Sequence, residues 1–134
     1  TTDISELRKA VINNISLENY DPWGRTRDKS CSFYLFTAVH AALKYPYVKK
    51  YQDLLEESFT IVHYDQRGSG KSYQFGTDYS KVTASTHVDD LIGLTKYIEE
   101  YLRQEQVILV GHSYGTYIAT MAAAKESNLY SAYV

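Results

Sequence analysis

A buried strand, a G-x-S-x-G motif and a helix of small residues follow one another between Val107 and Ala119, in the sequence VILVGHSYGTYIA. This order is typical of a nucleophile elbow, a sharp turn that lifts a serine hydroxyl clear of a sheet. Gly111 and Gly115 leave room for the turn, because side chains there would collide with the neighbouring strand or helix. Ser113 would also lie at a helix N-terminus, where free amides favour a developing negative charge. The pattern predicts that Ser113 is a nucleophile; the alternative is a plain strand-to-helix turn.

The size and charge of the chain are typical of one globular domain. It has 134 residues, 44% of them hydrophobic, and a formal net charge of −2. These values allow a hydrophobic core large enough for a folded domain, and they indicate neither a nucleic-acid partner nor a membrane span. The lone Cys31 excludes an internal disulfide and fits a reducing compartment, so we expect a cytoplasmic protein. The polar residues 1–9 predict no signal peptide, and a first residue other than methionine favours a processed, trimmed or partial chain.

Alternating strands and helices predict an α/β fold with a doubly wound, mostly parallel sheet. Apolar runs rich in β-branched and aromatic residues predict strands at 32–39, 59–64, 106–110 and 131–134. Helical spacing of apolar residues predicts helices at 4–12, 47–57, 86–102 and 114–125. Polar composition and turn residues predict irregular structure at 13–30 and 72–85.

A turn with the sequence DQRGSGKS, at residues 65–72, follows the strand expected at 59–64. We expect the Asp65 carboxylate and Arg67 to hold this loop by charge-assisted hydrogen bonds. Gly68 and Gly70 permit backbone angles that other residues resist. The last three residues imitate the end of a phosphate-binding loop, G-x-x-x-x-G-K-S. The first glycine of that motif would fall on Asp65, which argues against nucleotide binding.

Together, the two motifs resemble those of the proline iminopeptidases, α/β-hydrolases that remove N-terminal proline from peptides. The turn at 65–72 is similar to the D-Q-R-G-x-G-x-S signature of that family, and G-H-S-Y-G at 111–115 follows at the family's spacing. The resemblance covers 45–134 well and 1–44 poorly. It implies a single partial α/β-hydrolase domain over 1–134, a truncated core that lacks the C-terminal strands and the cap.

The resemblance also implies roles for particular residues. Ser113 would attack a carbonyl carbon, and the backbone amide of Tyr114 would supply half of the oxyanion hole. Gly111, Gly115 and the 65–72 turn would be structural. The implied substrate is a small peptide or acyl compound. No metal, organic cofactor, nucleic acid or membrane partner is expected.

The sequence departs from this family in the catalytic base. In the α/β-hydrolase fold the chain order is serine, then an acid, then histidine. No histidine follows Ser113, and the only later acid is Glu126. Loss of the base costs a serine hydrolase several orders of magnitude in rate. The histidines that precede Ser113 are poor general bases, since we expect His112 in packing, His63 in the core, His87 solvated or capping a helix, and His40 at a strand end.

A second departure concerns the oxyanion hole. Where the family carries His-Gly-Gly-Pro-Gly, this chain has FTAVHAAL at 36–43. Read from the third base of the Phe36 codon, suitable synonymous codons spell His-Gly-Gly-Pro in a shifted frame. We hypothesise that about 30–44 is translated one frame away from a functional ancestor. Coincidence is the alternative, and the encoding DNA decides between the two.

Three functional hypotheses remain open from the sequence. The first is a serine hydrolase of the proline iminopeptidase type. The second is a catalytically inactive fragment or pseudoenzyme that acts at most as a binding module. The third keeps the fold but hydrolyses esters or lactones. The strand at 131–134 also presents an exposed edge in this interpretation, so we expect either a homodimer through that edge or poor solubility.

Overall fold

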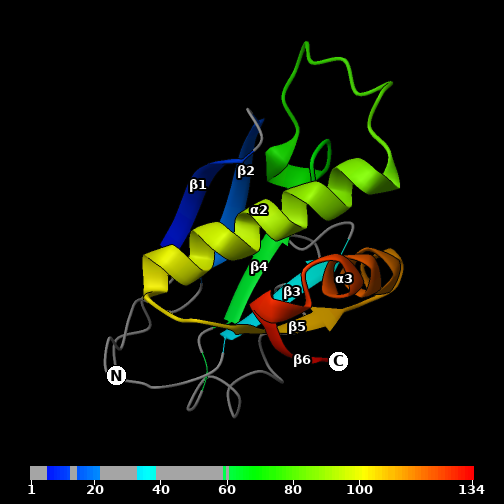
Figure 1. The fold of residues 1–134 in the computed structure, drawn as a ribbon. Helices are drawn as coiled ribbons and strands as arrows, with labels where there is room; N and C mark the ends of the chain where they lie inside the picture. Colours follow the sequence, from blue (N-terminus) through cyan, green and yellow to red (C-terminus); the bar gives the residue numbers. More distant parts are fainter. Residues whose placement is uncertain (1–5, 13–14, 22–32, 39–58, 60) are drawn as a thin grey trace.

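The computed structural model describes residues 6–12, 15–21, 33–38, 59 and 61–134. They form one sheet in the order β1-β2-β4-β3-β5-β6, with helices α2 and α3 packed beside each other (Figure 1). Pairing is parallel between β3 and β4, β3 and β5, and β5 and β6, and antiparallel between β1 and β2 and between β2 and β4. The strands are β1 (Glu6–Ile12), β2 (Ile15–Asp21), β3 (Phe33–Ala38), β4 (Ile61–Asp65), β5 (Val107–Gly111) and β6 (Tyr130–Tyr133).

The prediction of a mostly parallel α/β sheet is confirmed, but the N-terminal prediction is wrong. Residues 6–12 form strand β1 rather than a helix, and 15–21 form β2 within a segment predicted as irregular. Ile12 lies opposite Ile15, so only two residues separate the paired strands. Short apolar patterns fit either period, and pairing with the sheet decides between them. The asparagine pair at 13–14 was the missed signal of a hairpin. The helix predicted at 47–57 lies outside the described residues.

The two predicted helices that flank β5 are present as α2 (Ala84–Leu102) and α3 (Tyr114–Lys125). Helix α2 begins two residues earlier than predicted because a capping box stabilises its first turn. The Thr83 hydroxyl accepts from the Thr86 amide at 3.4 Å, and the Thr86 hydroxyl accepts from the Thr83 amide at 3.1 Å. The described residues also form two short 3₁₀ helices, η1 (Gly70–Ser72) and η2 (Ser127–Leu129).

The core lies between the helices and the central strands. Strand β4 is buried along its whole length, as expected for a strand covered on both faces. Small residues of α3 allow that helix to approach the sheet closely. The most buried apolar side chains, at 0% exposure, are Leu91, Leu94, Val107, Leu109, Ile118, Ala119 and Ala122. This packing fixes the ends of β4 and β5, where both sequence motifs begin.

Both motifs lie at the carboxyl edge of the parallel strands. Strands β4 and β5 lie on opposite sides of β3, with Ala38 opposite Asp65 and Thr37 opposite Gly111. In open α/β sheets, ligands bind outside the carboxyl ends of strands at such a switch in strand order. The topology therefore places the 65–72 turn and Ser113 at the edge where a ligand site is expected.

Candidate active site

Ser113 connects β5 to α3 in a conformation that few residues adopt. Its φ of 55° and ψ of −127° lie outside the regions that side chains favour. The residue is exposed, and its hydroxyl makes no capping hydrogen bond to α3. Its carbonyl accepts from the Thr116 amide at 3.0 Å, so the backbone turns directly into the helix. The strand, sharp turn and helix that the motif predicts are all present.

The turn requires a glycine at 111 for steric reasons. A Cβ atom on Gly111 would lie 2.7 Å from Thr116 Cα and 3.1 Å from the Tyr133 hydroxyl. The first of these contacts is with backbone, which a side-chain rotation cannot relieve. Gly115, the second residue of α3, is buried. The helix can therefore pass close to the end of β5.

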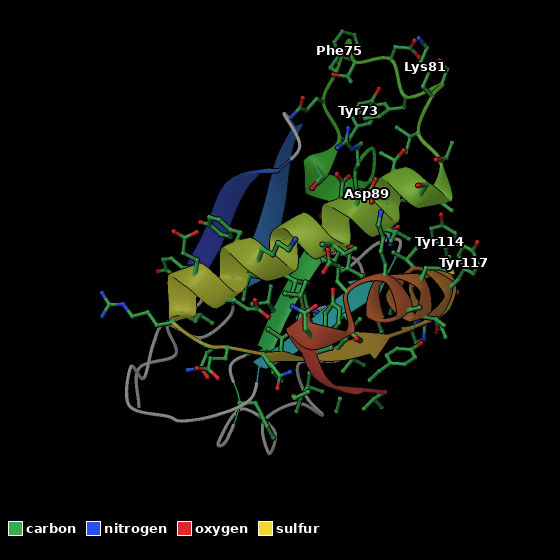
Figure 2. The ribbon with its side chains drawn as sticks, in the orientation of Figure 1. Tyr73, Phe75, Lys81, Asp89, Tyr114 and Tyr117 are labelled. Carbon is green, nitrogen blue, oxygen red and sulfur yellow. The ribbon has the colours of Figure 1, made fainter. Side chains whose placement is uncertain are left out.

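The Tyr114 amide is the candidate oxyanion donor. Tyr114 is the first residue of α3, and the first amides of a helix have no partner within it. They also form the positive end of the helix dipole. Tyr114 lies at the start of α3, beside the first turns of α2 (Figure 2). The family's second donor would lie within 36–43, and residues 39–43 of that segment fall outside the described residues.

The 65–72 turn folds tightly over Asp65. The Ser72 hydroxyl donates to the Asp65 carbonyl at 2.6 Å. Gly68 and Gly70 have φ values of +78° and +50°, and a Cβ on Gly70 would lie 2.6 Å from Asp65 Cγ. Asp65 itself is buried, at 4% exposure. Gly70 therefore lets the backbone cover a buried carboxylate that a larger residue would collide with, whereas a Cβ on Gly68 would lie 3.1 Å from the Tyr79 ring.

Arg67 pairs with a residue that the sequence interpretation did not identify. Its Nε donates to Asp90 Oδ2 at 2.7 Å and its Nη2 to Asp90 Oδ1 at 2.6 Å. Both side chains are largely buried. Arg67 holds the turn by charge-assisted hydrogen bonds, as predicted, and its partner is Asp90 on α2. Asp90 lies four residues before the buried Leu94, and so on the same face of the helix. This spacing was the signal in the sequence that Asp90 is buried.

The histidines lie only partly where we expected them. His63 is buried on β4 as predicted, and burial lowers its pKa to about 4, against the opposing effect of Asp65. His112 is exposed, so its predicted packing is wrong. His87 lies in the first turn of α2, near the predicted helix start, but its ring makes contacts that a solvated or capping role does not predict. Its Nδ1 lies 3.2 Å from the Tyr114 hydroxyl and its Nε2 lies 3.3 Å from the Arg67 carbonyl oxygen. His40 lies outside the described residues.

Glu126, the one acid after Ser113, lies at the opposite end of α3. It is the C-cap of this 12-residue helix, and a helix of that length spans about 18 Å. Its carboxylate lies 3.5 Å from Lys96 Nζ. Glu126 therefore cannot orient a base beside Ser113.

Two further classes of site are not seen in the part of the chain that the structure describes. No helix there is long and apolar enough to cross a membrane. No group of three or more histidine, cysteine, aspartate or glutamate side chains there could hold a metal ion.

Similarity to known structures extends over nearly the whole chain. A proline iminopeptidase-related protein from Thermus thermophilus matches with a TM-score of 0.68 and 25% identity, over 93% of this chain and 42% of that one. An epoxide hydrolase from Vigna radiata matches with a TM-score of 0.70 and 22% identity, over 96% of this chain and 38% of that one. At that identity, the second match shows the fold alone.

Sequence similarity points to the same family. The probable aminopeptidase YbaC of Bacillus subtilis (strain 168) is 34% identical over 87 residues, which are 65% of this chain and 27% of the relative. A 2-(acetamidomethylene)succinate hydrolase of Mesorhizobium japonicum is 39% identical over 75 residues, 56% of this chain and 24% of the relative. The chain thus spans about a quarter of the length of these curated relatives. The family model described as "alpha/beta hydrolase fold" matches residues 40–134, and the chain belongs to that family.

Proposed function

We propose that Ser113 is the nucleophile of a serine hydrolase which, in a longer form, removes N-terminal residues from peptides as proline iminopeptidases do. The observation that carries this proposal is the conformation of Ser113, exposed and with a φ of 55°, at the carboxyl edge of the sheet. The similarity to the probable aminopeptidase and to the proline iminopeptidase-related protein supports the peptide substrate.

The proposed chemistry is acyl transfer. Ser113 Oγ attacks the carbonyl carbon and loses its proton to a base, and the carbonyl oxygen becomes an oxyanion that accepts from the Tyr114 amide. The leaving amine takes a proton as the acyl-enzyme forms, and water then hydrolyses that ester. The base that takes the serine proton then donates it, as an acid, to the leaving amine, and the same group takes a proton from water in the second half of the reaction.

Among the residues that the structure describes, no histidine is placed as a base for Ser113. No histidine follows Ser113 in the sequence. Tyr114 and Arg67 engage both ring nitrogens of His87, and His63 is buried within β4. We therefore propose the second hypothesis, an inactive polypeptide with a hydrolase fold, for the 134-residue chain, while the hydrolase proposal concerns a longer form.

A fluorophosphonate probe tests the inactive form. We expect no appreciable labelling of Ser113 in the 134-residue polypeptide, because an unassisted serine is a poor nucleophile. Labelling that is lost in Ser113→Ala would show that a base reaches Ser113 and would overturn this part of the proposal.

A cysteine variant tests the nucleophile geometry without a histidine base, since thiolate forms readily near neutral pH. In a Cys31→Ser background, Ser113→Cys is treated with p-nitrophenyl acetate. Sulfur attacks the ester carbonyl, the thiol proton passes to solvent, and p-nitrophenolate leaves as the thioester forms. Ser85→Cys is the matched control, because Ser85 is also exposed and lies in the first turn of a helix.

We expect Ser113→Cys to acylate at least about tenfold faster than Ser85→Cys, since only the former combines a helix N-terminus with the strained turn. Equal rates would contradict the nucleophile proposal.

The substrate class is tested separately, on the full-length product of the gene that encodes this segment. Cleavage of a prolyl anilide supports the aminopeptidase, whereas cleavage of esters or lactones alone favours the third hypothesis.

A further inference from the structure

We propose that His87 is a positioning residue for the candidate oxyanion site, and that it acts as a neutral ring protonated on Nε2. This inference rests on the proposed function of Ser113 and extends it to a residue outside both sequence motifs. His87 lies in the first turns of α2. Its ring contacts the first residue of α3 on one side and the 65–72 turn on the other.

The hydrogen-bond partners of His87 determine where its proton lies. Nε2 is 3.3 Å from the Arg67 carbonyl oxygen, which can only accept, so Nε2 carries the proton. Nδ1 of the neutral ring is then an acceptor, and it lies 3.2 Å from the Tyr114 hydroxyl, which donates to it. The two hydrogen bonds therefore run in one direction, from the Tyr114 hydroxyl to the His87 ring and from that ring to the Arg67 carbonyl oxygen. The two rings also meet edge to face, with centroids 5.8 Å apart and planes at 79°.

Helix α2 holds Arg67 at two points. His87 binds its carbonyl oxygen and Asp90 binds its guanidinium group. His87 and Asp90 are three residues apart, so they lie on one face of the helix. The part of α2 that fixes the 65–72 turn therefore also fixes the side chain of Tyr114.

The consequence concerns the Tyr114 amide. Its direction depends on the first turn of α3, and Ser113 before it is held in an unfavourable backbone region. The bond from the Tyr114 hydroxyl to His87 restrains the same residue from its side-chain end. Small displacements of a catalytic group have large effects on rate. Loss of His87 would therefore slow a reaction that forms an oxyanion more than it slows a reaction that forms none.

Nitrogen-15 NMR of the 134-residue polypeptide tests the proton position directly, with His87→Gln used to assign the signals. We expect the ring shifts of a neutral imidazole protonated on Nε2, and a coupling or shift change at Nδ1 on Tyr114→Phe substitution. A ring protonated on Nδ1, or one insensitive to Tyr114→Phe, would overturn the proposal whatever the role of Ser113.

Kinetics of the Ser113→Cys, Cys31→Ser protein test the positioning role. Two reactions are compared in each variant: acylation by p-nitrophenyl acetate, which forms an oxyanion, and alkylation by iodoacetamide, which does not. We expect His87→Ala to lower acylation about tenfold relative to alkylation. His87→Gln should restore the ratio, because its amide can donate to Arg67 and accept from Tyr114.

Two comparisons separate positioning from general destabilisation. Tyr114→Phe should match His87→Ala, and the double variant should lose no more than either single one, since both remove the same bond. Asp89→Asn removes a different contact between α2 and α3, the 2.8 Å pair with Lys125, and should leave the ratio unchanged. Equal ratios in His87→Ala and Asp89→Asn would overturn the positioning role. Failure of the parent Ser113→Cys protein to acylate would instead overturn the role of Ser113.

Discussion

At the scale of single residues, the turn that presents Ser113 depends on the space that Gly111 leaves beside Thr116. Two separate constraints act on glycines in this chain. At Gly111 the constraint is contact with backbone, whereas Gly76 has a φ of +82° with nothing within 4 Å of a Cβ atom. The two positions therefore separate steric collision from backbone strain.

Substitution of these glycines by alanine should have unequal effects on stability. We expect Gly76→Ala to cost about 1 kcal/mol, the usual penalty for a side chain at positive φ. Gly111→Ala should cost about 2 kcal/mol or more, because α3 must move away from β5. Urea denaturation of both variants measures the difference. Equal losses would show that the end of β5 relaxes without cost.

His63 makes the stability of the fold depend on pH. Burial lowers its pKa from 6.5 to about 4, while the charge of Asp65 opposes the shift. Between these values the unfolded chain holds more protons than the folded one, so acid favours unfolding. The contribution of neutral His63 to the free energy of unfolding is complete above pH 6.5, and it is lost progressively as the pH falls to about 4.

Over that pH range, the lost stability attributable to His63 should reach about 3 kcal/mol. Urea denaturation of the parent and of His63→Gln at several pH values between about 7 and about 4 measures it. We expect the variant to show a smaller loss of stability on acidification. Parallel pH profiles for the two proteins would assign the acid sensitivity to other groups.

At the scale of elements, two adjacent acids on α2 make very different contacts. Asp90 is buried against Arg67, with side-chain exposures of 2% and 13%. Asp89 pairs with Lys125 on the surface, with exposures of 51% and 58%. Removing one partner of a buried pair leaves an uncompensated charge, whereas exposed pairs contribute little.

Asp90→Asn should therefore destabilise the fold by about 3 kcal/mol or more, while Asp89→Asn changes it little. Thermal or urea unfolding of the two variants gives the comparison. The two substitutions alter charge equally, so net charge does not explain a difference. Equal stabilities would mean that the Arg67 contact is replaced, for instance by water.

The elements that the sequence predicted well are those with a long, unambiguous pattern. Helix α2 has apolar residues on one face over five turns, and β5 is a short continuous apolar run. Strand β4 is rich in β-branched and aromatic residues, and both strands lead into glycine-containing turns. Strand β1 was missed because seven residues satisfy a helical period as easily as a strand, and only its partner decides. The contacts of His87 join residues 20 and 27 positions apart. No local pattern contains such contacts.

At the scale of the whole molecule, the sequence predicted where the candidate site lies better than how it is held. Parallel strands bring the 65–72 turn and the 111–115 motif to one edge, and that follows from strand order alone. The restraints on the site come from α2, through Asp90 and His87. They depend on how α2 packs beside α3, which spacing along the chain does not specify.

The free side of β6 predicts how the polypeptide associates. Within the described residues β6 pairs only with β5, and all of its residues after Tyr130 are exposed. The Val134 amide donates to the Leu109 carbonyl and its carbonyl accepts from Gly111. In a parallel ladder the amide and carbonyl of the preceding residue, Tyr133, then point away from β5. An unpaired strand edge favours pairing with a second copy.

We therefore expect the 134-residue polypeptide to form a homodimer through β6, seen as a concentration-dependent mass in size-exclusion chromatography with light scattering. Val134→Lys places a charge on the edge, at a side chain that is 68% exposed, and should shift the equilibrium to monomer. Phe75→Lys is the control, because Phe75 is 97% exposed and lies on the loop after η1. A parent that stays monomeric at all concentrations contradicts the edge-strand dimer. A dimer that dissociates with Phe75→Lys but not with Val134→Lys places the contact on that loop instead.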